Sequence, residues 1–257
     1  MVAAACKVCV ECMRAAIEGI RDDKLKTGLQ VADKVGEIML KNRCHSACMC
    51  DGDGFKHACC VSVNDCVAHG VPSDKPFFAG DVITVDLVVH HGNGYMGDMA
   101  RTIVHGVDET HSVVTDNRNL LETIIRNYNE SDDRNYLALE SAIVTAYDDY
   151  DKLKHGRVVR TLTGHYIGQR MHMLPSIGAG CIASTTHVLK PGDTMCIEPV
   201  CVAHRDITQL TDDRVRVEPN KKDEYIASTA DHVGAHHENT YEVMTDLRLQ
   251  CLTEYNV

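Results

Sequence analysis

Two carboxylates interrupt a strongly apolar stretch of the chain, TVDLVVHHGNGYMGD at residues 84–98. Asp86 lies inside a strand-like run, and Asp98 follows a turn rich in glycine. Because both aspartates lie six residues from Gly92, we predict a hairpin that makes them near cross-strand neighbours, with Cβ atoms roughly 4.5–5.5 Å apart. Two buried carboxylates at that separation repel, and one of them becomes protonated unless a cation lies between them. The pattern therefore predicts a cation site.

A short pattern that contains one of these aspartates occurs twice in the chain. In each copy a His-x-x-Pro segment precedes a Gly-Asp turn, and a carboxylate lies five residues beyond the turn aspartate. The first copy comprises His69, Pro72, Gly80, Asp81 and Asp86, and the second comprises His172, Pro175, Gly192, Asp193 and Glu198. The repetition predicts a duplicated unit whose two halves present equivalent strands, each with one carboxylate and one imidazole, to a shared centre.

The acidic residues at this centre suit metal binding. Asp86, Asp98 and Glu198 are joined by Glu238, at the start of a later strand-like segment. Four carboxylates are too many for one small ion, but they suit two divalent ions about 3.5–4 Å apart that share bridging ligands. His165 is the candidate nitrogen ligand, because flanking glycines allow close approach of backbone and metal.

The remaining histidines divide into two groups. His69 and His172, from the repeated pattern, are candidates for proton transfer or for polarising a carbonyl group. The chain contains 15 histidines, so most are surface or incidental residues. We interpret the His-His pairs at 90–91 and 236–237 in that way.

Hydrophobic periodicity outlines the elements that position these residues. Helical spacing predicts helices at 28–42, 112–128 and 133–153, and strand-like patterns occur at 59–63, 81–89, 94–106, 157–163, 193–202 and 238–244. The polar segment 218–237 is the best candidate for a loop insertion. No linker-like tract divides the chain, which favours a single α+β domain.

Composition limits the compartment and the partners. The net charge of −11 argues against nucleic acid or an anionic membrane as the main partner. No apolar run is long enough to cross a bilayer, and Lys7 and Glu11 interrupt any apolar core of a signal peptide. Thirteen cysteines without a secretory signal indicate free thiols in a reducing compartment, so we expect a cytoplasmic protein.

Six separately spaced motifs resemble type I methionine aminopeptidases. They are CCVSVNDCVAHGVP, AGDVITVDLVV, GYMGD, GHYIGQRMHMLP, LKPGDTMCIEPV and ENT, in the order of that family, and the resemblance runs from about Thr27 to Met244. It implies a pita-bread fold, in which pseudo-twofold related halves form an antiparallel sheet backed by helices. It predicts one metallopeptidase domain at residues 1–257, with a short N-terminal helix at about 1–26 and a catalytic core at about 27–250.

The resemblance also implies a role for each site residue. By position, Asp86 chelates one of two divalent ions, His165 and Glu198 hold the other, and Asp98 and Glu238 bridge them. Glu242 is the alternative to Glu238, because the preceding loop is longer than is usual in the family. Glu198 also serves as the acid/base partner. The remaining residues with implied roles are His69 and His172 at the substrate and the tetrahedral intermediate, and Cys48, Phe55, Cys60 and Met171 at the methionine pocket.

This chain departs from the family at several neighbouring positions. Val88 and Met99 replace threonines that hydrogen-bond near the metals, and Met173-Leu174 replaces two glutamates. The chain has no tryptophan, whereas the family covers its pocket with one. These departures affect turnover and substrate fit more than the type of reaction.

The implied activity is removal of the initiator methionine from nascent proteins, by attack of a metal-bridging hydroxide on the first peptide bond. We expect two ions of cobalt, manganese, iron or zinc, a peptide or nascent-protein N-terminus as substrate, and a monomer that associates transiently with the ribosome. One alternative is a proline-specific Xaa-Pro peptidase of the same fold, and another is a non-catalytic protein-binding domain. Cys6, Cys9 and Cys12 form either a zinc or iron–sulfur site or a stripe of small apolar thiols packed on a sheet.

Overall fold

The computed structural model describes residues 1–49, 54–107, 112–153, 156–178, 187–204, 216–219, 225–228 and 232–255. Its helices are α1 (Val2–Arg21), α2 (Gly28–Lys41), α3 (Ser112–Asn129) and α4 (Tyr136–Leu153). Its strands are β1 (His45–Ser46), β2 (Cys60–Val63), β3 (Cys66–Ala68), β4 (Val82–His90), β5 (Met96–Val104), β6 (Gly156–Val158), β7 (Gly164–Tyr166), β8 (Met173–Ile177), β9 (Thr194–Ile197), β10 (Val200–His204), β11 (Arg216–Pro219), β12 (Tyr225–Ser228), β13 (His232–His236), β14 (Glu238–Val243) and β15 (Leu249–Cys251).

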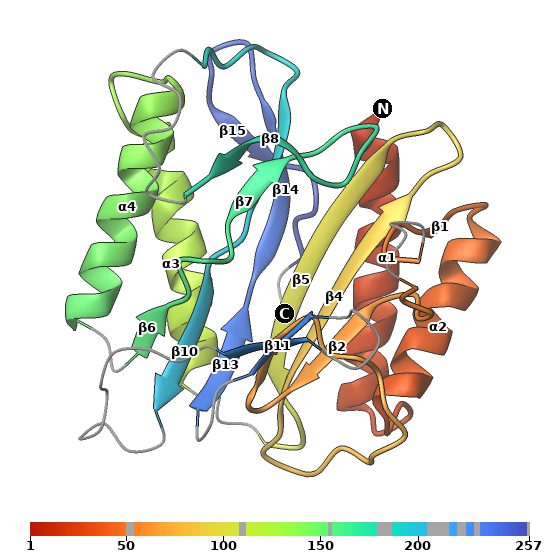
Figure 1. Ribbon diagram of the computed structural model, residues 1–257. Helices are drawn as coiled ribbons and strands as arrows, with labels where there is room; N and C mark the ends of the chain where they lie inside the picture. Colours follow the sequence, from red (N-terminus) through yellow and green to blue (C-terminus); the bar gives the residue numbers. More distant parts are fainter. Residues whose placement is uncertain are drawn as a thin grey trace.

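The fold is a curved antiparallel sheet backed by two pairs of helices, as expected for an α+β pita-bread architecture. The main sheet runs in the order β1-β4-β5-β14-β9-β7-β8, with β2 added beside β4 and β15 beside β14. Figure 1 shows α1 and α2 at the right, beside β4 and β5, and α3 and α4 at the left, beside the other half of the sheet. Strands β5 and β14, far apart in sequence, pair at the centre.

Each half of the molecule has its own hydrophobic core. One core joins α1 and α2 to the strand residues Ile83, Val85, Leu87 and Met99, and the other joins α3 and α4 to Met195, Ile197 and Tyr241. On β4 these core residues have odd numbers, so the even-numbered residues, including Asp86, point to the opposite face of the sheet. Helix packing on one face therefore leaves the other face for the predicted ligands.

The two copies of the repeated sequence pattern fold into equivalent turns. Gly80 and Gly192 have φ angles of 90° and 87°, a region that glycine adopts without steric cost. In the first copy the Asp81 carboxylate accepts from the Phe78 amide at 2.8 Å. In the second copy the Asp193 carboxylate accepts from the Lys190 amide at 2.9 Å.

The strands that leave these turns are also held in the same way. The Gly80 amide donates to the His105 carbonyl, and the His105 amide donates to the Asp81 carbonyl. The Gly192 amide likewise donates to the Val243 carbonyl, and the Val243 amide donates to the Asp193 carbonyl. This matching set of hydrogen bonds supports the predicted duplication, and it makes β4 and β5 equivalent to β9 and β14.

The register of the first hairpin differs from the prediction. Asp86 pairs with Ala100 and Asp98 pairs with Val88, so the two aspartates are diagonal neighbours on one face of the sheet. Pairing continues as far as His90 and Met96, which centres the turn on Asn93 instead of Gly92. A shift of two residues keeps both carboxylates on the same face, because side chains alternate with a period of two.

The segment expected to be a loop insertion contains regular structure. Within 218–237, strand β12 pairs with β11 and β3, and β13 pairs with β10. The prediction of a polar loop was wrong for these residues. Pairing with neighbouring strands satisfies their backbone N–H and C=O groups, and the polar composition alone does not reveal that pairing.

The cysteines of α1 lie in the core and, within the described part of the chain, do not form a metal site. Cys6, Cys9 and Cys12 are fully buried on the face of α1 that packs on β4 and β5, and none of them belongs to a metal-compatible group in the described residues. The run is therefore a stripe of small apolar thiols. All cysteines that the structure describes are free thiols.

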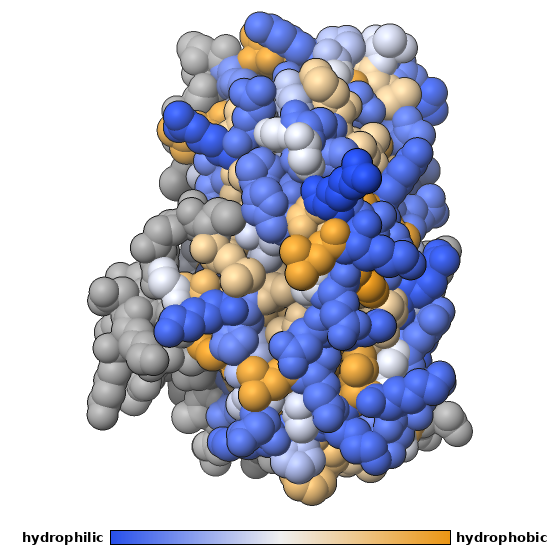
Figure 2. Space-filling view, turned by 90° about the vertical axis from the view of Figure 1, so that its right-hand side faces the viewer, coloured by the Kyte–Doolittle hydropathy of each residue, from blue (hydrophilic) through white to orange (hydrophobic). Residues whose placement is uncertain are grey.

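The outer surface beside α1 and α2 is largely polar. Figure 2 shows mostly hydrophilic residues on this side of the molecule, with separate apolar ones between them. Leu40 of α2 is 73% exposed. No helix in the described ranges is both long enough and apolar enough to span a membrane.

Candidate metal centre

The predicted ligands lie in two adjacent rows that cross the central strands of the sheet. In one row, Asp86 on β4 and Glu238 on β14 pair with the same residue of β5, Ala100. Glu198 directly follows Ile197, which pairs with Asn239 of β14. Pairing of β9 with β14 therefore brings Glu198 next to Glu238.

The second row lies one pleat along the strands. Asp98 on β5 is bound to Thr240 on β14, whose hydroxyl accepts from the Asp98 amide at 3.0 Å and donates to its carbonyl at 2.9 Å. Thr240 pairs with Cys196 of β9, which pairs with His165 of β7. Strand pairing thus assembles residues from four strands without any long loop.

His165 has the orientation expected of a metal ligand. Its Nδ1 lies 3.1 Å from the Tyr166 carbonyl, which makes Nδ1 the protonated nitrogen and leaves the Nε2 lone pair free. Nε2 lies 3.3 Å from Glu198 Oε1 and 3.7 Å from Asp98 Oδ2. A Cβ atom on Gly164 would lie 2.4 Å from the Cys196 carbonyl, so only glycine allows β7 this close to β9.

Burial dominates the electrostatics of the four acids. It raises the pKa of Asp86, and it raises the pKa of Asp98, Glu198 and Glu238 well above their ordinary values. The acids reinforce one another: Glu238 raises the pKa of Asp98, and Asp98 raises that of Glu198. Burial also lowers the pKa of His165 to about 4, so this ring is neutral near pH 7 and can act as a ligand.

Several polar atoms at the centre have no hydrogen-bond partner among the described residues. They are Asp98 Oδ1, Glu198 Oε1, Glu238 Oε1 and both ring nitrogens of His236. Unpaired polar atoms in such a buried place are costly unless a ligand binds them. Oxygen donors with imidazole nitrogens suit a divalent metal, so the residues present fit the predicted cofactor class.

His236 was missed by the sequence interpretation. The pair His236-His237 was grouped with surface or incidental residues, but the two residues are 4% and 2% exposed. The prediction was wrong because β13 continues into β14 through the middle of the molecule, where both faces of the strand are covered. His236, Glu198 and Glu238 form one metal-compatible group, and Asp98, His165, Cys196 and Glu238 form another. A histidine two residues before a predicted ligand, on the same face of a strand, was the available signal.

The two histidines of the repeated pattern flank the acids. The His172 ring contacts the His165 ring edge-on, with centroids 4.6 Å apart. His69 lies near enough to Asp86 and His236 to lower the pKa of each. Both histidines are exposed, so they lie between the buried carboxylates and solvent, where a substrate would enter.

The predicted pocket residues are only partly brought together. Cys48 and Cys60 form a hydrogen bond with each other, and Cys60 pairs with Asp86 across β2 and β4. Phe55 contacts His57, and Met171 contributes a backbone hydrogen bond to His165. Glu242, the alternative to Glu238, belongs to neither metal-compatible group in the described residues.

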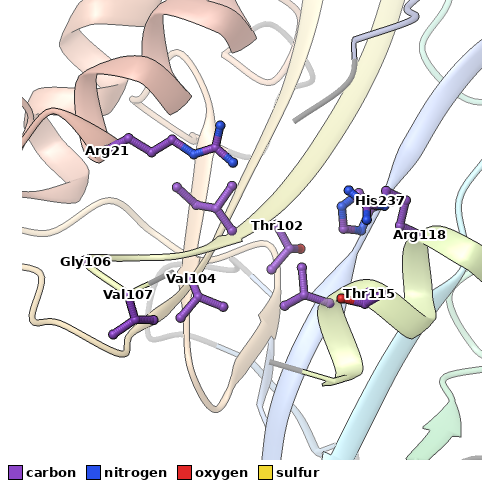
Figure 3. Close-up of a pocket in the computed structure, with 10 residues that line it drawn as sticks. Arg21, Thr102, Val104, Gly106, Val107, Thr115, Arg118 and His237 are labelled. Carbon is purple, nitrogen blue, oxygen red and sulfur yellow. The ribbon is translucent and has the colours of Figure 1, made fainter. Parts of the chain in front are cut away.

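A separate cavity of about 390 Å³ lies near the end of β5. Figure 3 shows Arg21 of α1 on one side of it, and Arg118 and His237 on the other. None of the predicted ligands lines this cavity. His237 lines it while its Nδ1 lies 2.9 Å from Asn117 Oδ1, so the two adjacent histidines face different surroundings.

The fold and the buried donor set define a metallopeptidase of the pita-bread class, and comparison with known families agrees. Residues 1–245 match metallopeptidase family M24, and the chain belongs to that family. A methionine aminopeptidase of Escherichia coli K12 is 27% identical over 223 residues, which cover 83% of this chain and 79% of that protein. The crystal structure of a methionine aminopeptidase from Thermotoga maritima is 27% identical, has a TM-score of 0.79, and is matched over 99% of this chain and 95% of its own.

These comparisons confirm the resemblance to methionine aminopeptidases and the use of a divalent metal. A prolidase from Pyrococcus furiosus shares the fold, with 21% identity, a TM-score of 0.66, and coverage of 100% of this chain and 64% of its own. The chain spans 32% and 49% of the lengths of curated relatives from Plasmodium falciparum and Arabidopsis thaliana.

Proposed function

We propose that this chain is a metal-dependent aminopeptidase that removes an N-terminal methionine from peptides and nascent proteins. The observation that carries the proposal is that Asp98, His165 and Glu238, and Glu198 with Glu238, fall into two metal-compatible groups among the described residues. Asp86 belongs to neither group, but it lies in the same row of the sheet as Glu238. These five residues would hold two divalent ions. When bound, such ions supply a water of lowered pKa as nucleophile and polarise the scissile carbonyl group.

The residues of the chain have separate tasks in this reaction. Glu198, partly buried next to Glu238, can accept a proton from the attacking water and return it to the leaving amide nitrogen. His69 and His172, exposed at the edge of the centre, can donate hydrogen bonds to the carbonyl oxygen as it becomes negative. The metal-loaded centre would bind the free α-amine of a substrate, which would restrict cleavage to chain ends.

The methionine side chain would contact the region of Cys48 and Cys60. Their mutual hydrogen bond beside Asp86 provides a soft, weakly polar surface next to the ligands, which suits a thioether. Phe55 and Met171 are proposed to complete this pocket. A monomeric state, the cytoplasm as the compartment and transient association with the ribosome remain predictions from the sequence.

Peptide hydrolysis tests the proposal. The purified protein, loaded with cobalt or manganese, should release methionine from Met-Ala-Ser, and it should cleave neither the N-acetylated peptide nor an Ala-Pro peptide. Asp98→Ala should lose bound metal and activity together, whereas His172→Ala should retain the metal and lose most turnover. Preferential cleavage of the Ala-Pro peptide would favour the proline-specific alternative. Full metal occupancy with no hydrolysis of either peptide would favour a binding domain.

A further inference from the structure

The His236 side chain is the feature of the centre that the proposed ligand set leaves unexplained. It is 4% exposed, and neither ring nitrogen has a hydrogen-bond partner among the described residues. Its Nε2 lies 3.7 Å from Glu238 Oε2 and 3.8 Å from Glu198 Oε2. These separations exceed the 2.7–3.2 Å typical of a hydrogen bond, so the ring points at two carboxylates without bonding to either.

The separations are slightly longer than those of two atoms that share an ion. Two ligand atoms at about 2.1 Å from one metal are roughly 3.0–3.6 Å apart for angles between 90° and 120°. His165 Nε2 lies at 3.3 Å and 3.7 Å from its neighbouring carboxylate oxygens. The distances around His236 Nε2 therefore resemble those around the nitrogen that the family resemblance already assigns as a ligand.

The internal duplication gives an independent reason for a ligand at this position. His236 lies seven residues before Val243, and Asp98 lies seven residues before His105, the equivalent residue of the first half. His236 pairs with Val200 as Asp98 pairs with Val88. His236 is thus the counterpart of Asp98.

Two threonines hold these counterparts with the same hydrogen bonds. The Thr240 hydroxyl accepts from the Asp98 amide and donates to the Asp98 carbonyl. The Thr102 hydroxyl accepts from the His236 amide at 2.8 Å and donates to the His236 carbonyl at 2.9 Å. Each half of the molecule therefore fixes the backbone of the other half's residue, and both side chains point toward Glu238.

We propose that His236 Nε2 is a sixth ligand of the metal centre, in the position that the internal duplication makes equivalent to Asp98. The inference rests on the proposed function only in requiring that the centre binds divalent ions. A second imidazole gives the centre two nitrogen donors. This composition favours borderline ions such as cobalt, iron and zinc over manganese and magnesium, which prefer oxygen.

Proton NMR of the cobalt-loaded protein distinguishes one coordinated histidine from two. The N–H proton of an imidazole bound to high-spin cobalt(II) is shifted far downfield and disappears in D₂O. Wild type should show two such signals. His236→Gln should lose one of them, His165→Gln should lose the other, and the control His187→Gln should keep both, because His187 is bonded to Tyr166 outside the centre. Equilibrium dialysis should show cobalt binding weakened at least about tenfold in His236→Gln.

Each outcome bears on one claim. A single exchangeable signal in wild type that only His165→Gln removes, with unchanged cobalt affinity in His236→Gln, would overturn the role of His236 and leave the proposed function intact. Absence of cobalt binding by wild type would contradict the proposed function itself. Circular dichroism of each variant verifies folding, and His236→Asn provides a second variant if His236→Gln does not fold.

Discussion

Thr102 and Thr240 occupy equivalent positions in the two halves of the chain, and each binds the backbone of a residue at the metal centre through one hydroxyl group. They lie on β5 and β14, the two strands that pair at the centre of the sheet. The positions of the metal-binding atoms therefore depend on the pairing of β5 with β14 as well as on which residues serve as ligands.

Removal of one hydroxyl group tests this dependence. Thr240→Val deletes both hydrogen bonds to Asp98 and leaves two buried backbone groups without that partner, which should cost about 1–3 kcal/mol in the free energy of unfolding. Thr240→Ser keeps the hydroxyl and should behave like wild type. Urea denaturation measures the loss of stability, and cobalt titration measures the loss of metal affinity that should accompany it. Equal cobalt affinity in Thr240→Val and wild type would show that Asp98 is held in place by other contacts.

Gly164 provides a test in which no polar group is removed. A Cβ atom at this position meets the Cys196 carbonyl at 2.4 Å, so Gly164→Ala must move β7 away from β9 and displace His165. We expect metal affinity to fall at least about tenfold, since ligand placement within a fraction of an ångström matters. Gly92→Ala, in the hairpin turn, is the control, because its Cβ would lie 3.4 Å from the nearest atom. Isothermal titration calorimetry of both variants measures their metal affinities.

The buried acids predict an unusual effect of pH on the metal-free protein. Burial raises the pKa of Asp98, and Glu238 and Asp86 raise it further. The folded chain then keeps a proton that the unfolded chain loses near pH 4, so this group lowers the free energy of unfolding as the pH rises from about 4 toward its folded-state pKa.

Asp98→Asn removes that contribution. In excess chelator near neutral pH, the variant should be more stable than wild type, and the difference should shrink toward pH 4. Added cobalt should reverse the order, because it stabilises only the chain that binds it. Thermal unfolding across this pH range is the measurement, and a metal-free Asp98→Asn variant that is less stable at every pH would contradict it.

The cysteine stripe of α1 should behave as core. Burial raises the pKa of Cys6 and Cys12 to about 12, and that of Cys9 well above its ordinary value, so all three thiols should resist alkylation in the native state. Cys9→Ser should lower stability by about 1–3 kcal/mol, since it buries a hydroxyl among apolar groups, while the metal content stays that of wild type. Mass spectrometry after iodoacetamide treatment checks the first point. Loss of metal from Cys9→Ser would support a zinc or iron–sulfur site at these cysteines.

Much of the site could be predicted because the repeated pattern and the family motifs mark strand positions with a period of two. Asp86 and Glu198 were located from the Gly-Asp turns, and those turns have the same hydrogen bonds in the structure. The exact hairpin register could not be predicted, because a five-residue turn and a shorter one leave the same residues facing inward. His236 was missed because the strand that contains it lies in a polar segment. The burial of His236 becomes evident only from the pairing of β13 with β10.

The central claim is that the buried carboxylates and His165 gather divalent ions between the two halves of the sheet. An anomalous difference map at the cobalt absorption edge, from crystals of the cobalt-loaded protein, tests it most directly. Two peaks about 3.5–4 Å apart are expected among Asp86, Asp98, His165, Glu198 and Glu238. Cobalt found only elsewhere on the protein, with this cluster free of any peak, would contradict it.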